Sequence, residues 1–237
     1  MMQFLSSRAA LPLVAVAAAL LGAGATLLVS RHNDGSEIRE YLLAHPEVLP
    51  EAMQRLQEKS NAKTIAANRA DILTPVGSAW AGNPNGDVTV VEYLDYNCGY
   101  CRASLPTVDQ LIAADPKVKV IYRELPVLSA ESETAARYAI IAGRMGKYDA
   151  LHRALYAGGP LTEASMDKAL ATAGLDLARV KAEAKTASVE AAIKTNLSLM
   201  RPLGMTGTPT WVIGDRVVSS VMSLEDMRDA VAAARAK

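Results

Sequence analysis

The chain of 237 residues contains two cysteines, Cys98 and Cys101, separated by two residues. The stretch 88–96, VTVVEYLDY, is rich in β-branched and aromatic residues and predicts a buried strand, and a helix is expected from Cys98 onward. Free backbone N–H groups and the helix dipole favour an anion at a helix start, so the pKa of Cys98 should fall below that of a free thiol. Cys101, one turn further along, should be more buried and more protonated. We therefore expect Cys98 to attack a disulfide and Cys101 to resolve the mixed disulfide.

A structural cross-link and a zinc site are the alternatives for this pair. A disulfide that closes so short a loop stabilises by roughly 2 kcal/mol on the chain-entropy model, and a domain of this size does not need it. Two cysteines supply half of a tetrahedral zinc site, and His32, His45 and His152 lack the spacing of zinc-finger ligands. Redox chemistry is therefore favoured, with no cofactor and no metal expected. Because the chain has no third cysteine, an external partner must reduce or oxidise the pair.

The elements expected around the cysteine pair are those of an α/β domain. A second strand is predicted at 118–125, and with the first strand and the intervening helix it forms a βαβ unit of a parallel sheet. Residues 130–203 are almost entirely helical in composition. Residues 209–221 predict a β-hairpin that turns at Gly214 and Asp215, and a final helix is expected after Ser223, which can cap it.

Two motifs resemble the thioredoxin superfamily, and specifically the exported DsbA-like thiol–disulfide oxidoreductases. They are CGYC at 98–101, after a strand, and TGTPTWVIGD at 206–215, before the hairpin. The resemblance implies a thioredoxin-like catalytic domain at 74–237 with a helical insertion at about 130–203. It also implies that Pro209 follows a cis peptide bond and faces the cysteine pair. Because Pro209 has no N–H, Thr208 would present its own backbone groups to an extended client segment beside the disulfide.

Three further residues are assigned to the site. Glu92 lies six residues before Cys98 and matches a buried acid of DsbA-like proteins. The resemblance implies that Glu92 relays a proton to or from Cys101, and the alternative is a solvated carboxylate at the end of the strand. Gly99 and Tyr100, between the cysteines, are expected to contact the client. They add no charge that would further stabilise the thiolate, so we expect a milder oxidant than a CPHC-type enzyme.

The stretch 31–73 is strongly helical in composition and is expected as a separate segment before the catalytic domain. Pro46 and Pro50 are expected to divide it into a short and a longer helix. Its apolar residues recur at three-, four- and seven-residue steps and form a stripe: Ile38, Tyr41, Leu42, Leu49, Met53 and Leu56, continued weakly by Ile65 and Ile72. The stripe predicts self-association, and the segment resembles the N-terminal oligomerisation segment of ScsC-like members of the DsbA family. The alternative is that it folds back onto its own domain.

Residues 1–30 are expected to form an export signal or a membrane anchor. The run from Ala9 to Val29 carries no charge and lies at the boundary between a secretory signal and a membrane-spanning helix. Either outcome places the rest of the chain in the periplasm, soluble or tethered to the inner membrane, where disulfides persist. The 25 basic residues balance the 25 acidic ones, which argues against a nucleic-acid partner held by phosphate contacts.

We expect an exported thiol–disulfide oxidoreductase that acts on cysteines of protein clients. An oligomeric isomerase or reductase is favoured, because several catalytic domains on one stalk form a cleft for a misfolded client. The combination of CGYC with Thr208 before Pro209 also resembles exported isomerases. A DsbA-like dithiol oxidase is the second candidate, and a non-enzymatic holdase or Cu(I)-binding chaperone represents another class. The expected partners are cysteine-containing clients, a membrane redox partner, and further copies of the chain, bound through its N-terminal helices.

Overall fold

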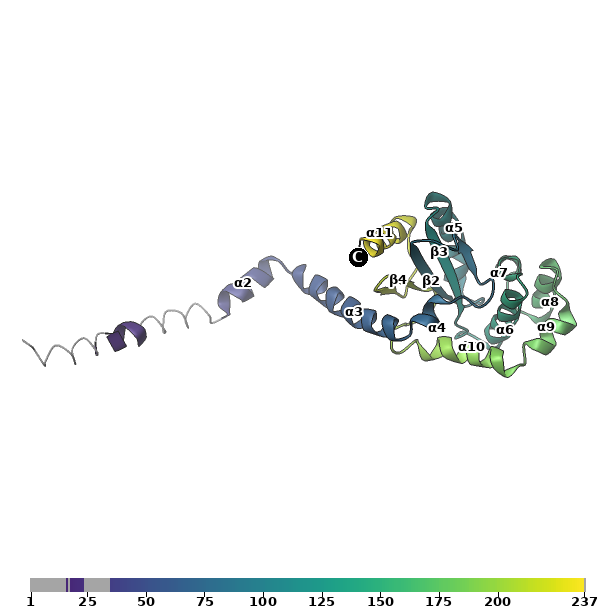
Figure 1. Ribbon diagram of the computed structural model, residues 1–237, viewed down its shortest axis with the longest axis horizontal. Coiled ribbons are helices and arrows are strands. Elements are labelled where there is room, and N and C mark those ends of the chain that lie inside the picture. Colours follow the sequence, from purple (N-terminus) through teal and green to yellow (C-terminus); the bar gives the residue numbers. More distant parts are fainter. Residues whose placement is uncertain (1–15, 17, 24–34, 237) are drawn as a thin grey trace, which may run out of the picture. The chain divides into compact units, whose positions relative to one another are not determined.

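The computed structural model describes residue 16, residues 18–23 and residues 35–236 of the chain. The predicted export or anchor segment at 1–30 lies outside this part, apart from residues 16 and 18–23. Within these ranges, no helix combines the length and the apolar character that a membrane crossing requires. The chain divides into two compact units, residues 1–55 and residues 56–237 (Figure 1).

A five-stranded sheet forms the centre of the second unit (Figure 1). In spatial order its strands are β1 (Trp80–Gly82), β3 (Val118–Glu124), β2 (Val88–Leu94), β4 (Thr210–Ile213) and β5 (Arg216–Val218). β2 and β3 pair in parallel and are connected through α5 (Gly99–Ala114), which confirms the predicted βαβ unit. The other strand pairs are antiparallel, and β4 and β5 form the predicted hairpin. The short edge strand β1 was not expected from the sequence.

β2 ends at Leu94, before its predicted end, because the next residue bonds to the loops instead of continuing the strand. One carboxylate oxygen of Asp95 accepts the backbone N–H of Asn97 at 2.8 Å. The other accepts the N–H groups of Val127 at 2.9 Å and Leu128 at 3.0 Å. These bonds fix the turn that leads from β2 into α5, so the role of Asp95 is structural.

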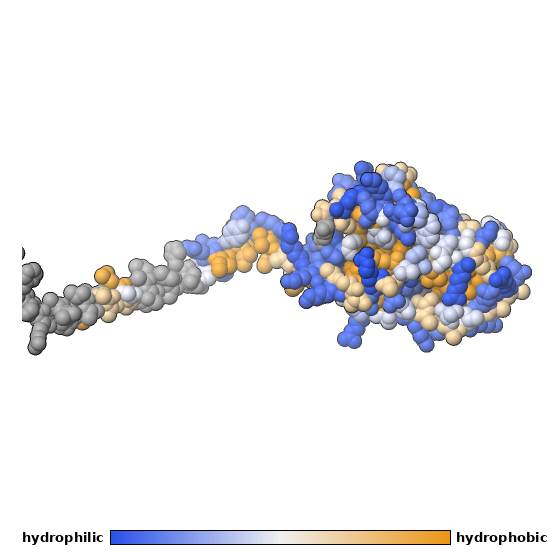
Figure 2. Space-filling model, viewed as in Figure 1, coloured by the Kyte–Doolittle hydropathy of each residue, from blue (hydrophilic) through white to orange (hydrophobic). Residues whose placement is uncertain are grey.

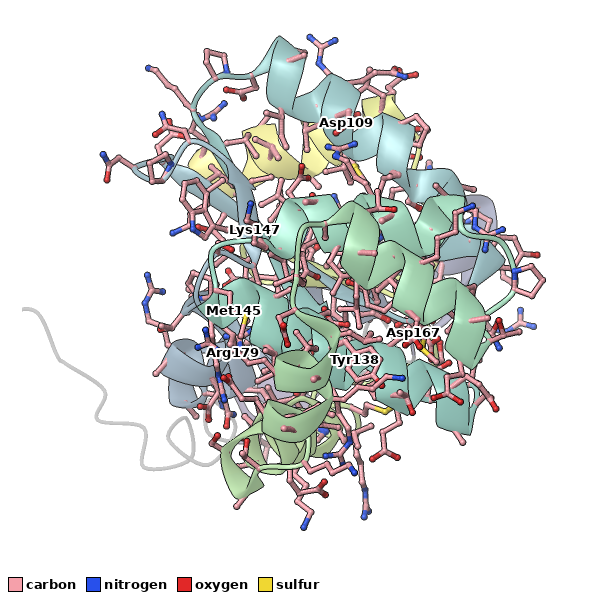
Figure 3. All side chains as sticks on the ribbon, turned by 90° about the vertical axis from the view of Figure 1, so that its right-hand side faces the viewer. Asp109, Tyr138, Met145, Lys147, Asp167 and Arg179 are labelled. Carbon is pink, nitrogen blue, oxygen red and sulfur yellow. The ribbon has the colours of Figure 1, made fainter. Side chains whose placement is uncertain are left out.

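The predicted insertion at 130–203 consists of helices that pack beside the sheet. They are α6 (Ala130–Arg144), α7 (Tyr148–Ala157), α8 (Glu163–Thr172), α9 (Leu177–Glu183) and α10 (Ala187–Ser198). An ion pair at 2.7 Å joins Arg153 on α7 to Asp109 on α5. Figure 3 labels Asp109. α11 (Leu224–Arg235) follows the hairpin, and Ser223 caps it as predicted, because its hydroxyl accepts the N–H of Asp226 at 3.1 Å.

Successive residues of β2 point to opposite faces of the sheet, and each face has its own core. Val90 and Leu94 belong to the larger core, which α5, α6, α7 and α11 complete. Val91 and Tyr93 belong to the smaller core on the other face. Glu92 lies between Val90 and Leu94 in this alternation, so its carboxyl faces the larger core, on the side of α5.

Between residue 35 and the first strand the helices are α2 (Ser36–Ala44), α3 (Val48–Ala67) and α4 (Arg69–Leu73). The expected break falls at residues 45–47, which include Pro46. Pro50 does not break a helix, contrary to expectation, because it lies in the first turn of α3, where a proline removes no helical hydrogen bond. Most of the predicted apolar stripe is exposed on α2 and α3 (Figure 2): Ile38, Tyr41, Leu49, Met53 and Leu56.

The second compact unit begins at Leu56, so it includes the second half of α3 and α4 together with the catalytic domain predicted from residue 74 onward. Ile65 and Ile72 are buried in the smaller core beneath the sheet. Arg123 on β3 donates to the carbonyl oxygens of Ile72 at 3.3 Å and Thr74 at 2.6 Å, which fixes the end of α4 to the sheet. The stripe therefore does not continue to Ile72 as one exposed face. The second half of the segment at 31–73, which contains Ile65 and Ile72, packs against the catalytic domain. Folding back onto this domain was the alternative expectation for the segment.

Candidate active site

Cys98 is the N-cap residue of α5, at the junction that the sequence predicts. Its backbone is extended, and its Sγ accepts the backbone N–H of Cys101 at 3.4 Å. Its own N–H donates to the carbonyl oxygen of Asp95 at 3.1 Å. The side chain is 6% exposed, so the sulfur lies just below the surface at the positive end of the helix.

The two thiols have opposite pKa shifts. The hydrogen bond from the Cys101 thiol is the main cause that lowers the pKa of Cys98 from 9.0 to about 5, and backbone N–H groups of Tyr100 and Cys101 add to it against the effect of burial. Burial raises the pKa of Cys101 far above its ordinary value, and the Cys98 sulfur and the Glu92 charge add to the shift. At neutral pH, Cys98 is therefore a thiolate and Cys101 a thiol.

The peptide bond between Thr208 and Pro209 is cis. The Cys98 thiol, when protonated, donates to the carbonyl oxygen of Thr208 at 3.1 Å. The Thr208 side chain also helps to lower the pKa of Cys98, and its buried hydroxyl has no other hydrogen-bond partner in the described part of the chain. The loop before β4 thus lies directly against the nucleophile.

A surface groove runs beside Cys98 between the start of α5 and the β4–β5 hairpin. Tyr100 is 69% exposed on its rim, and a Cβ built on Gly99 would meet no atom within 4 Å. The space next to the sulfur is therefore open to a second chain. The groove is lined by Tyr100, Thr206, Gly207, Thr208, Pro209, Ser219, Ser220 and Val221.

Glu92 lies behind the cysteine pair and is 2% exposed. It is opposite Tyr122 on β3 and Trp211 on β4, so the carboxyl has strands on both sides. Burial raises the pKa of Glu92 to about 8, and the charges of Glu124 and Cys98 add to the shift. Because Glu92 also raises the pKa of Cys101, the two groups are close enough to influence each other's protonation.

Sequence reasoning missed a second buried acid and its partners. Glu124, at the end of β3, accepts the hydroxyl of Tyr148 at 2.7 Å and that of Tyr96 at 3.4 Å. The Tyr96 hydroxyl also contacts Nδ1 of His152 at 3.1 Å. Burial raises the pKa of Glu124 to about 8 and lowers that of His152 to about 3. The available signal was an acid at the end of a strand predicted to run parallel to β2.

Of the residues assigned to the site from the sequence, Cys98, Cys101, Thr208 and Glu92 come together in one place, with Cys98 between the surface groove and the buried acids. Pro209, Gly99 and Tyr100 lie on the groove side. Among the residues that the structure describes, no group of three or more His, Cys, Asp or Glu side chains is placed to hold a metal ion.

Two family models match the chain. The model described as Thioredoxin matches residues 74–233, which is more than half of the sequence. The model described as Copper resistance protein ScsC N-terminal domain matches residues 35–63, which contain most of α2 and α3.

Solved structures share this fold. A thioredoxin-like oxidoreductase from Silicibacter pomeroyi is 38% identical with a TM-score of 0.68, over 72% of this chain and 99% of that chain. The thiol-disulfide exchange protein alpha-DsbA2 from Wolbachia pipientis is 28% identical with a TM-score of 0.68, over 77% of this chain and 97% of that chain. The catalytic domain of Proteus mirabilis ScsC is 25% identical with a TM-score of 0.65, over 74% of this chain and 99% of that chain.

The curated relatives include two proteins named Na(+)/H(+) antiporters, NhaA 1 of Salinispora arenicola and NhaA 3 of Salinispora tropica. They are 28% and 27% identical to this chain over 156 residues, which is 65% of its length. The chain spans about a quarter of the length of these relatives, 24% in each case.

Proposed function

Because this chain belongs to the thioredoxin family and its domain at 74–233 is of the thiol–disulfide oxidoreductase type, we propose that it is an exported enzyme that isomerises or reduces disulfides of client proteins. The observation that carries the proposal is the position of the Cys98 sulfur at the start of α5, 3.4 Å from the Cys101 N–H and 3.1 Å from the Thr208 carbonyl oxygen. A thiolate there, with a protonated thiol one turn behind it, provides an attacking and a resolving sulfur.

The exchange begins with Cys98. Its thiolate attacks one sulfur of a client disulfide, the client S–S bond breaks, and the second client sulfur leaves as a thiolate. In the isomerase cycle a client thiolate then displaces Cys98, which returns reduced. In the reductase cycle Cys101 loses its proton and attacks the Cys98 sulfur, so the Cys98–Cys101 bond forms, the client cysteine leaves, and two electrons pass to the client.

The groove beside Cys98 is the proposed client site. When Cys98 is a thiolate, it no longer donates to the Thr208 carbonyl oxygen, which can then accept an N–H from an extended client segment. Gly99 and the exposed Tyr100 leave room for that segment next to the sulfur. Backbone pairing of this kind tolerates many client sequences.

The isomerase assignment depends on the N-terminal helices. The match to the ScsC N-terminal model and the exposed apolar residues of α2 and α3 support self-association of the segment before the catalytic domain. Several catalytic sites held on one helical assembly can act on one misfolded client. We also propose that residues 1–30 direct or anchor the chain outside the cytoplasm, where its clients form disulfides.

A DsbA-like oxidase is the second candidate, and the pKa of Cys98 favours it. A pKa of about 5 stabilises the reduced form as a thiolate, and a pair whose reduced form is stabilised is a stronger oxidant. The redox state of the pair in cells, determined by thiol alkylation, separates the candidates: a reduced pair supports the isomerase or reductase, and an oxidised pair supports the oxidase.

Refolding of a protein with scrambled disulfides tests the proposed activity. We expect Cys98→Ser to abolish the recovery of native disulfides. Cys101→Ser should retain attack but accumulate a mixed disulfide with the client, visible as a covalent complex on non-reducing gels. Undiminished activity of Cys98→Ser would contradict the proposal and indicate a holdase. An inactive wild type that binds Cu(I) through both thiols would indicate a copper chaperone.

A further inference from the structure

Behind the cysteine pair, the larger core contains two acids where an ordinary core would have none. Glu92 on β2 and Glu124 on β3 are both almost fully buried, at 2% and 3% exposure. β2 and β3 are adjacent and parallel, and their register places Glu92 opposite Tyr122 and Leu94 opposite Glu124. Because alternate residues share a face, both carboxyls point to the side covered by α5 and α7.

The two acids differ in their hydrogen bonds. Oε1 of Glu124 accepts two hydroxyl groups, from Tyr148 at 2.7 Å and from Tyr96 at 3.4 Å. No donor to the Glu92 carboxyl is recorded among the described residues. Hydroxyl donors favour the ionised form of an acid, and two negative charges in one apolar site are strongly unfavourable. A single charge on the pair therefore resides on Glu124, and the proton remains on Glu92.

No cation compensates this charge within the described part of the chain. Arg123 is adjacent to Glu124 in sequence, but its guanidinium bonds on the other face to the carbonyl oxygens of Ile72 and Thr74. His152 is neutral, because burial lowers its pKa to about 3. The ionisable groups around the acids come from the β2–α5 junction (Asp95, Tyr96, Cys98 and Cys101), from β3 (Tyr122) and from α7 (Tyr148, His152 and Tyr156).

We propose that Glu124 is a positioning residue that acts through Glu92: it ionises before Glu92, because Tyr148 and Tyr96 donate hydrogen bonds to it, and its charge then keeps the proton on Glu92, so that Glu92 can give that proton to Cys101. This inference rests on the proposed thiol–disulfide exchange and adds the group that sets the protonation of its acid. The pKa shifts agree with this order of action. The charge of Glu124 raises the pKa of Glu92, and the charge of Glu92 raises the pKa of Cys101.

The proton is needed when the oxidised pair is opened. A thiolate attacks the Cys98 sulfur, the Cys98–Cys101 bond breaks, and its electron pair moves to the Cys101 sulfur. Cys101 is fully buried, so a thiolate there is costly, and it takes the proton of Glu92, which becomes a carboxylate. The attacking sulfur forms a mixed disulfide with Cys98 and is thereby oxidised, and Cys101 is reduced to a thiol, a change of two electrons. In the reverse direction, the Glu92 carboxylate takes the proton of Cys101 as the disulfide closes.

The test is the pH dependence of this opening step. The oxidised full-length protein is mixed with a cysteine-containing peptide from pH 5 to about pH 9.5, and the rate is expressed per peptide thiolate. In the wild type we expect the rate to fall as Glu92 loses its proton, with a midpoint well above the ordinary glutamate pKa of 4.5, because burial and the charge of Glu124 raise the pKa of Glu92. Glu124→Gln removes the repelling charge, so Glu92 ionises earlier and the midpoint should move down by about one pH unit.

Two further variants keep the test decisive if Glu124→Gln does not fold. Tyr148→Phe removes the shorter hydrogen bond to Glu124 and should move the midpoint in the same direction by a smaller amount. The matched control is Tyr93→Phe, which removes a buried hydroxyl without a partner from the opposite face of β2 and should leave the midpoint unchanged. Coincident profiles for the wild type, Glu124→Gln and Tyr148→Phe would overturn the inference. A wild-type disulfide that the peptide does not open at any pH would instead overturn the proposed function.

Discussion

Cys98 and Cys101 lie one helical turn apart, and their surroundings give them different chemistry. Cys98 accepts hydrogen bonds at the start of α5, which lowers its pKa to about 5, whereas burial raises the pKa of Cys101. A thiolate of low pKa is ionised at neutral pH and is also a good leaving group. Cys98 can therefore attack a client disulfide and later leave from the mixed disulfide, while Cys101 remains a protonated thiol until it resolves that disulfide.

The stability of the reduced protein should depend on this shift. Between pH 5 and pH 9 the folded protein has lost the Cys98 proton that the unfolded chain retains, so the shift contributes stability that is complete above pH 9 and lost as the pH falls through 5. Glu92 and Glu124 act oppositely: their pKa values rise from 4.5 to about 8, so their contribution is complete below 4.5 and lost as the pH rises through 8.

Cys98→Ser isolates the thiol contribution. We expect the free energy of unfolding of the reduced wild type, minus that of Cys98→Ser, to increase from pH 5 to pH 9. Urea unfolding in the presence of a phosphine reductant measures this difference. As an independent check, the alkylation rate of Cys98 in the wild type should have a midpoint near pH 5. A difference that is constant over this range, together with an alkylation midpoint near pH 9, would show that the thiol is not perturbed.

At the scale of elements, the junction of β2 and α5 positions the nucleophile. The Asp95 carboxylate ends the strand by binding three backbone N–H groups, so α5 begins at a fixed place and Cys98 becomes its N-cap. The loop before β4 adds Thr208 from more than a hundred residues away. The site therefore requires both halves of the split domain, which the antiparallel pairing of β2 with β4 brings together.

α4 is expected to behave as part of the catalytic domain, although it precedes the region matched by the thioredoxin model. Ile72 is fully buried in the smaller core, so Ile72→Ala should lower the free energy of unfolding by about 2–5 kcal/mol. The control is Leu43→Ala on α2, where the side chain is 65% exposed and the change should stay within about 0.5 kcal/mol. Chemical denaturation compares them, and equal effects would mean that α4 does not pack on the sheet.

At the scale of the whole molecule, the chain combines a catalytic unit with an N-terminal unit whose apolar side chains have little to cover them. α2 and the first part of α3 expose Ile38, Tyr41, Leu49 and Met53 (Figure 2). Large exposed apolar patches mark interaction surfaces in proteins. Together with the match to the ScsC N-terminal model, this exposure favours association between copies of the chain.

Substitution within the stripe tests this association without deleting α3, whose second half is part of the catalytic unit. If copies of the chain associate as proposed, the double variant Leu49→Glu, Met53→Glu should convert the oligomer to monomers in light scattering. It should lose isomerase activity on a scrambled protein and still reduce a small peptide disulfide. Lys59→Glu, an exposed charge change on the same helix, is the control and should leave the oligomer intact. A monomeric wild type, or an unchanged size of the double variant, would contradict the proposed assembly.

The sequence determined those features that depend on short-range chemistry. The β-branched run before Cys98 predicted a strand, the turn at Gly214 predicted the hairpin, and Ser223 predicted the start of α11. Such elements follow from local propensity, capping and alternation, which are properties of neighbouring residues. The motifs CGYC and TGTPTWVIGD indicated the fold through their resemblance to the thioredoxin superfamily, and each of them is a contiguous stretch of the chain.

Only the tertiary structure decided which polar side chains are buried away from water. Glu124, Tyr148 and His152 are separated along the chain, and nothing in their local sequence shows that one core encloses them. Likewise, periodicity placed Ile72 on the same stripe as Met53, but only packing against the sheet buried the first and left the second exposed. Protonation and burial depend on desolvation by elements distant in sequence, so they are settled only when the chain has folded.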